Sequence, residues 1–137
     1  MAALTADFDC PYVDGKVRSL PMAAGATIYK GALVVMAAGN AAPGSAALNL
    51  VCVGRAENQV SNVGGAAGAA SIKVRRGTFA WNSGAGADAI TEANIGQTAY
   101  IIDDNTVGLT SGGGTRSVAG VIFDIDAISG NPFITTP

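Results

Sequence analysis

The chain has 137 residues, the size of one ordinary domain, and is long enough to bury a core without disulfides or a metal. Only 13% of its residues are charged, where a typical soluble domain carries about a quarter, and 49% are hydrophobic. The net charge is −2 and the basic residues are scattered except for Arg75 and Arg76, so DNA and RNA are not expected partners. So few charges leave apolar surface that favours burial against partners, and we predict an assembled state.

Targeting and membrane signals are not visible in the sequence. Residues Met1–Asp7 lack the basic and apolar regions of a secretory signal. The longest apolar run, Ala32–Ala38, is far shorter than the roughly 20 residues needed to span a bilayer. We therefore expect synthesis in a cytosol and no membrane contact. Cys52, between two valines, is predicted to be a buried and reduced thiol, while a disulfide with Cys10 stays open as an alternative.

Residues 1–15 form a segment of their own, ahead of a single β domain over residues 16–137. In this segment three aspartates are interleaved with apolar side chains. The alternation predicts an extended arm that pairs as an edge strand on another subunit by β-augmentation, and Leu4, Phe8 and Tyr12 are then the side chains expected to fill pockets. A frayed terminus is the alternative interpretation.

From residue 16 onward, short strand-like runs alternate with clusters of Gly, Pro, Asn and Ser. In the clearest run Ile72 and Val74 face one side and Lys73 and Arg75 the other, the period of two that marks a half-buried strand. We predict strands at Lys16–Leu20, Leu33–Ala38, Leu50–Ala56, Ser71–Arg75, Thr78–Trp81, Ala99–Ile102, Val107–Thr110 and Val118–Ile125. The expected fold class is all-β: a small antiparallel β-barrel or sandwich with the extended N-terminal arm.

The connections have turn chemistry of their own. Asp103–Asn105 lies between two predicted strands and predicts a hairpin, because Asp and Asn tolerate the left-handed conformation of tight turns. Gly112–Gly114 and Asn62–Ala70, rich in small residues, are predicted to be mobile unless a partner orders them. A helical pattern occurs at Asp88–Ile95, where one or two turns end before Gly96, so we expect at most one short helix.

The residues of common catalytic and metal sites are largely missing. There is no histidine, which removes Ser-His-Asp and Cys-His catalysis and histidine zinc sites, and two cysteines are too few for a four-thiolate zinc site. Asp124–Gly130 begins like a calcium loop but has Ile128 at its fifth position and no Glu at its twelfth. The pair Asp103–Asp104 is explained by turn chemistry. We predict a protein that is not an enzyme and has no cofactor or metal.

Two further motifs contain residue types found in binding sites. Gly112–Ser117 has the glycines of a phosphate loop but lacks its lysine and its helix. Arg75, Arg76, Phe79 and Trp81 combine the ingredients of a single-strand-binding face, which the acidic net charge opposes. Phe79 and Trp81, two positions apart, are more simply core or interface side chains. Because Trp and Arg are enriched at protein interfaces, we take these four residues as candidate partner contacts.

Five Gly-and-apolar pieces occur in a fixed order: Ala24–Val35, Val51–Ala56, Ser71–Gly77, Ile95–Ile101 and Val118–Ile122. This order resembles that of the small tailed-phage capsid decoration proteins, also called cement or head-stabilisation proteins, and covers about residues 16 to 135. The resemblance implies an all-β, barrel-like domain on the outside of a capsid, often as a trimer. The longer loop at residues 62–70 and the N-terminal arm depart from a typical member and leave the subunit contacts open.

The resulting expectation is a structural virion protein on the capsid exterior, synthesised in the host cytoplasm, that binds the major capsid protein as a homotrimer. Its arm would add a strand to a capsid-protein sheet. The alternative is a carbohydrate-binding or adhesive β-domain on a virion or cell surface, with Trp81, Tyr29 or Tyr100 as stacking platforms. A small hydrolase or isomerase is a third class, which the missing histidine disfavours.

Overall fold

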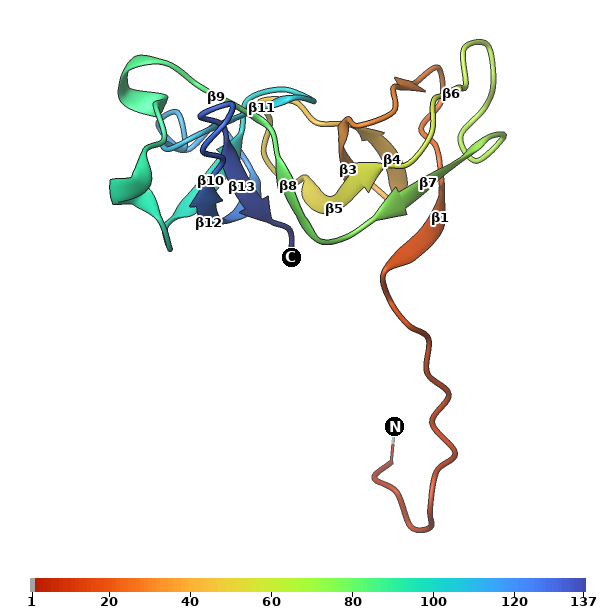
Figure 1. Ribbon diagram of the computed structural model, residues 1–137. Coiled ribbons are helices and arrows are strands. Elements are labelled where there is room, and N and C mark those ends of the chain that lie inside the picture. Colours follow the sequence, from red (N-terminus) through yellow and green to blue (C-terminus); the bar gives the residue numbers. More distant parts are fainter. Residues whose placement is uncertain (1) are drawn as a thin grey trace.

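The structure, a computed structural model, describes residues 2–137 and is nearly all-β (Figure 1). Its strands are β1 (Val17–Pro21), β2 (Thr27–Ile28), β3 (Leu33–Ala37), β4 (Asn40–Pro43), β5 (Val51–Ala56), β6 (Val60–Ser61), β7 (Ser71–Arg75), β8 (Thr78–Ala80), β9 (Asn82–Ser83), β10 (Thr98–Ile101), β11 (Thr106–Gly108), β12 (Val118–Ile125) and β13 (Pro132–Thr135). Two short 3₁₀ helices, η1 (Gly86–Asp88) and η2 (Glu92–Asn94), follow β9. Within residues 2–137 no helix is long and apolar enough to cross a membrane.

The first sheet has the strand order β1-β7-β5-β3-β4, with all neighbours antiparallel. Its two edges approach each other, because Met22, directly after β1, forms a parallel bridge with Ala41 of β4. The Ala23 N–H also donates to the Ala41 carbonyl at 2.9 Å. The sheet is therefore curled, and the short β2–β6 ribbon lies next to β4.

The second sheet has the order β8-β13-β12-β10-β11-β9 and is antiparallel except for the β9–β11 pair. Figure 1 shows it on the left, with the first sheet on the right and the connection into β8 running between them. Among the described residues the sheets do not close into a barrel, so the architecture is that of a sandwich.

Two hydrophobic cores lie on the two faces of β3, which is why its first three residues are all buried. Leu33 and Val35 belong to the core between the sheets, and Val34 to the core inside the curled first sheet. The inter-sheet core consists of Leu33, Val35, Cys52, Phe79, Trp81, Ile90, Ala99, Ile101, Val107, Ala119, Ile122 and Ile134. The second core consists of Met22, Ile28, Ala32, Val34, Ala41, Val53, Ala56, Ile72 and Val74.

Two glycines allow close approach between strands. Gly54 of β5 has a φ of +136°, and a Cβ there would collide with the Arg75 carbonyl of β7. A Cβ at Gly120 of β12 would collide with the Thr135 carbonyl of β13. Both glycines belong to the pieces that carry the sequence resemblance, so backbone geometry explains part of that pattern.

The sequence prediction of an all-β sandwich is confirmed, whereas the barrel alternative is not. Each of the eight predicted strands corresponds to an observed strand, with ends that differ by at most two residues. The five strands that were not predicted are β2, β4, β6, β9 and β13. The helical pattern at Asp88–Ile95 proves to be parts of two 3₁₀ helices rather than one α-helix.

The hairpin at Asp103–Asn105 is confirmed by the antiparallel pairing of β10 with β11, but its turn works differently from the prediction. The non-glycine residues with positive φ are Ala38 and Asn49, outside this turn. Instead the Asp103 Oδ1 accepts a hydrogen bond from the Asn105 N–H at 2.9 Å. This is an Asx turn, in which a side chain takes the place of a backbone acceptor.

The Asn62–Ala70 loop, predicted to be mobile, is anchored to the body. Asn62 is 4% exposed, and its side-chain amide donates to the carbonyls of Ala23 at 2.9 Å and Ala66 at 3.0 Å. The Gly68 N–H donates to the Met22 carbonyl at 2.8 Å. A buried amide with satisfied donors fixes this loop from inside the chain, a role that its Gly- and Ala-rich composition did not reveal.

Candidate interaction surface

The N-terminal arm, residues 2–15, runs away from the β body (Figure 1). Three of its large apolar side chains, Leu4, Phe8 and Tyr12, are 72%, 65% and 94% exposed. The arm also carries three of the chain's acidic residues and none of its basic ones. It therefore presents apolar side chains on an acidic segment that the body leaves uncovered.

The backbone of the arm is free as well. In residues 2–15 the backbone hydrogen bond present is local, from the Cys10 N–H to the Phe8 carbonyl at 3.0 Å. Pairing with the body begins at Lys16, whose carbonyl accepts from the Arg76 N–H at 2.9 Å. An extended segment with unpaired N–H and C=O groups can add a strand to the edge of another sheet.

Phe79 and Trp81 require a correction, because both are buried in the core of the chain itself. They are 9% and 5% exposed, with ring centroids 5.6 Å apart at a tilted angle of 56°. The Trp81 indole N–H donates to the Gly31 carbonyl at 3.1 Å, so the polar atom of the indole is satisfied internally. Their predicted role as partner contacts is therefore wrong, and the core role that their spacing also allowed is correct.

Arg75 and Arg76 differ in their surroundings. Arg75 Nε donates to Glu57 Oε1 at 2.8 Å, and Arg55 Nη2 donates to the same oxygen at 3.2 Å. Burial raises the pKa of Glu57, but the hydrogen bonds from both arginines outweigh burial and hold that pKa below its ordinary value. Arg55 also lies over the Phe79 ring, 4.5 Å from its centroid. Arg76 is exposed and takes part in none of the ion pairs of residues 2–137.

Asp88 is held by the chain around it. Its Oδ1 accepts from Thr110 Oγ1 at 2.6 Å, from the Thr110 N–H at 3.1 Å and from Arg116 Nη1 at 3.0 Å. The Thr110 hydroxyl is the main cause of its lowered pKa, which burial opposes and Arg116 reinforces. This ion pair also fixes the ends of the Gly112–Gly114 loop, which was predicted to be mobile. Asp88 is thus held by structural contacts with Thr110 and Arg116.

The calcium-like segment is also a turn. Asp126 Oδ1 accepts from the Ile128 N–H at 3.0 Å, and its Oδ2 accepts from Ser129 Oγ at 2.8 Å. The bond from the Ile128 N–H is the main cause that lowers the pKa of Asp126. Within residues 2–137 no three Cys, Asp or Glu residues gather as a metal-binding group.

The cysteines behave as the sequence indicated. Cys52 is 2% exposed within the inter-sheet core, and burial raises the pKa of its thiol to about 11. Cys10 is exposed on the arm, and both cysteines are free. The disulfide alternative is therefore absent from this structure.

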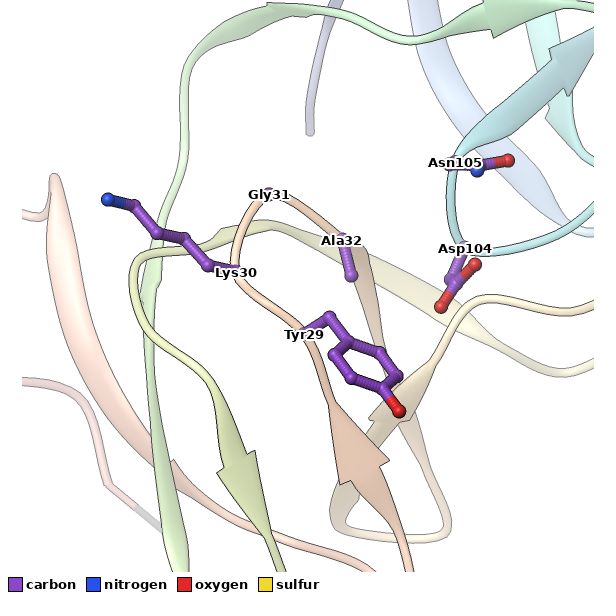
Figure 2. Close-up of a pocket in the computed structure, with 6 residues that line it drawn as sticks. All are labelled: Tyr29, Lys30, Gly31, Ala32, Asp104 and Asn105. Carbon is purple, nitrogen blue, oxygen red and sulfur yellow. The ribbon is translucent and has the colours of Figure 1, made fainter.

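A hollow of about 290 Å³ opens between the β2–β3 connection and the β10–β11 turn (Figure 2). It is lined by Tyr29, Lys30, Gly31, Ala32, Asp104 and Asn105. Of the three aromatic residues proposed as sugar platforms, Tyr29 is 57% exposed here, Tyr100 is half-buried and Trp81 is buried. The sequence did not predict that Tyr29 and Asp104 line the same hollow, because no local pattern links residues so far apart.

Comparisons with protein-family models, with curated proteins and with solved structures find no match to this chain.

Proposed function

We propose that this protein is a structural virion protein that binds the outer surface of a phage capsid and stabilises it, as a trimer whose N-terminal arms contact the major capsid protein. The observation that carries the proposal is the arm of residues 2–15, which leaves a folded β body and offers exposed apolar side chains and unpaired backbone groups together. The sequence resemblance to capsid decoration proteins supplies the partner.

In the proposed mechanism the arm adds a strand to the edge of a capsid-protein sheet. Its backbone groups set the register, and Leu4, Phe8 and Tyr12 fill pockets on the capsid. Full burial of such side chains contributes about 1.5–3 kcal/mol each. Three arms on one trimer bind together, so release requires several sites to open at once, and modest contacts per subunit give a durable attachment.

Arg76 is a supporting contact in this proposal, since its guanidinium is exposed and in no ion pair of the described residues. Arg75 is already engaged with Glu57. Charges at the rim of an interface mainly affect the association rate and its salt dependence. Arg76→Ala is therefore expected to weaken capsid binding much less than changes in the arm.

The proposal is tested by deleting residues 2–13 and measuring co-sedimentation with undecorated phage capsids. We expect the deletion to abolish saturable binding, because it removes all three apolar anchors and most of the strand. Binding that is unchanged by the deletion would sink the arm-based mechanism.

A finer variant replaces Leu4, Phe8 and Tyr12 by alanine and keeps the arm backbone. We expect at least about a hundredfold loss of affinity, since three buried side chains are truncated. Val63→Ala serves as the matched control, because Val63 is an equally exposed apolar residue, at 75%, on a loop of the body. Light scattering measures the mass of the free protein before it is mixed with capsids and again after it is eluted from them. Protein that is monomeric in both measurements would contradict the trimer.

A further inference from the structure

The hollow beside Tyr29 has rigid walls, although its two sides come from distant parts of the sequence. The Leu33 N–H donates to the Asp104 carbonyl at 2.7 Å and ties the β10–β11 turn to the start of β3. The Asn82 N–H donates to the Asn105 carbonyl at 2.8 Å, and the Trp81 indole N–H donates to the Gly31 carbonyl at 3.1 Å. A site whose backbone is fixed in this way loses little conformational freedom when a ligand binds.

Two side chains face each other across this hollow, the Tyr29 ring and the Asp104 carboxylate (Figure 2). The Tyr29 ring is more than half exposed. Among residues 2–137 the Asp104 carboxylate makes no side-chain hydrogen bond and joins none of the three ion pairs, so its oxygens are available as acceptors. In Figure 2 the side chains of Lys30 and Asn105 point away from the Tyr29 ring and the Asp104 carboxylate.

This combination selects a class of ligand. An aromatic ring offers an apolar platform, while a free carboxylate accepts hydrogen bonds from hydroxyl groups. The Asp104 carboxylate disfavours an anionic ligand. A neutral ring with one C–H face and several hydroxyls can stack on Tyr29 and donate a hydrogen bond to Asp104. The volume of the hollow is near the lower end for small-molecule sites, which suits one such ring.

We propose that this hollow binds one pyranose ring of a neutral sugar, with the C–H face stacked on Tyr29 and a hydroxyl group donating to Asp104. The site is separate from the N-terminal arm and stands independently of the capsid-binding proposal. One ring in an open hollow gives weak binding per site, and many copies on one particle would multiply it. The activity would be adhesion to a glycan-bearing surface.

Saturation-transfer NMR with methyl glycosides of glucose, galactose, mannose and N-acetylglucosamine tests the proposal on the full chain. We expect saturation of the ring protons of at least one glycoside, strongest on one face of the sugar. The fluorescence of Trp81 provides a second readout, since it is the single tryptophan and its indole N–H binds a carbonyl that lines the hollow.

Substitutions at Tyr29 and Asp104 test whether these two side chains bind the sugar. Tyr29→Ala is expected to abolish transfer and Tyr29→Phe to retain it, because stacking needs the ring rather than the hydroxyl. Asp104→Asn is expected to weaken binding about tenfold by replacing a charge-assisted hydrogen bond with a neutral one. Phe123→Ala, which removes an aromatic ring of similar exposure, 64%, from β12 of the body, is the matched control and should bind as the native chain does.

Three results would overturn the proposal. The first is the absence of transfer to every glycoside in the native chain, and the second is unchanged binding in Tyr29→Ala. The third is displacement of the sugar by tetramethylammonium at equal concentration, which would mark a cation site instead. Capsid co-sedimentation of Tyr29→Ala should equal that of the native chain, so failure here is distinct from failure of the arm mechanism.

Discussion

Asp88 shows how a single carboxylate organises residues that are distant in the sequence. It is bound by Thr110 and Arg116 and so connects η1 with the two ends of the glycine loop before β12. Its side chain is 19% exposed, and that of Arg116 is 18% exposed. A half-buried pair of this kind is screened less than a surface pair, and removing one partner leaves the other charge poorly solvated.

The lowered pKa of Asp88 predicts acid sensitivity. Because the folded-state pKa lies below the unfolded value, the stabilisation is fully present above the ordinary carboxyl range near about 3.9 and is lost as the pH falls through the folded value. Asp88→Asn should lower the free energy of unfolding at neutral pH by about 1–3 kcal/mol. Urea denaturation at neutral pH and near pH 3 should then show a smaller acid-induced loss in the variant than in the native chain. Asp7→Asn on the arm is the control, and an equal acid-induced loss in native chain and Asp88→Asn would contradict the prediction.

At the scale of elements, close contact between β12 and β13 depends on the absence of a side chain at Gly120. Gly120→Ala forces a methyl group against the Thr135 carbonyl, and overpacking of this kind costs about 1–3 kcal/mol. Val121→Ala, at the next and half-exposed position of the same strand, should cost less than about 1 kcal/mol. Denaturant midpoints of the two variants measure the difference. Equal midpoints would mean that β13 can shift away from β12 without loss.

The strands that the sequence predicted are those with a visible period of two or a run of buried residues. β2, β6 and β9 have two residues each, too few to show a period. β4 consists of small residues and a proline, and β13 begins with a proline, so their composition resembled a loop. Their pairing follows from tertiary contacts rather than from local preference.

The candidate site was also predictable only in part, because sequence patterns indicate local spacing but not which distant residues pack together. The composition of residues 1–15 indicated an arm separate from the core, because three aspartates are interleaved with its apolar side chains. The spacing of Phe79 and Trp81 showed that they share a face, but whether that face is covered depends on where the second sheet packs. The hollow between Tyr29 and Asp104 depends on long-range hydrogen bonds to the backbone of its two walls, for which the sequence carries no pattern.

For the whole molecule, the body and the arm are expected to be energetically independent. The described backbone of residues 2–15 makes no hydrogen bond to the body, and its large apolar side chains are exposed. Deleting residues 2–13 should therefore change the free energy of unfolding by less than about 0.5 kcal/mol. Urea denaturation of the truncated and full-length chains checks this. A clear loss of stability on truncation would show that the arm folds back onto its own body in solution.

Because one of the two cysteines is exposed and the other is buried, the chain can be labelled with a dye at a single thiol. Cys52 is buried and its pKa is raised to about 11, so at neutral pH a maleimide dye reacts at Cys10 on the arm. Trp81, the single tryptophan, sits fixed in the body and serves as an energy-transfer donor to a suitable dye. Energy transfer between Trp81 and a dye on Cys10 therefore reports the distance between body and arm, before and after a capsid is added, without introducing any mutation.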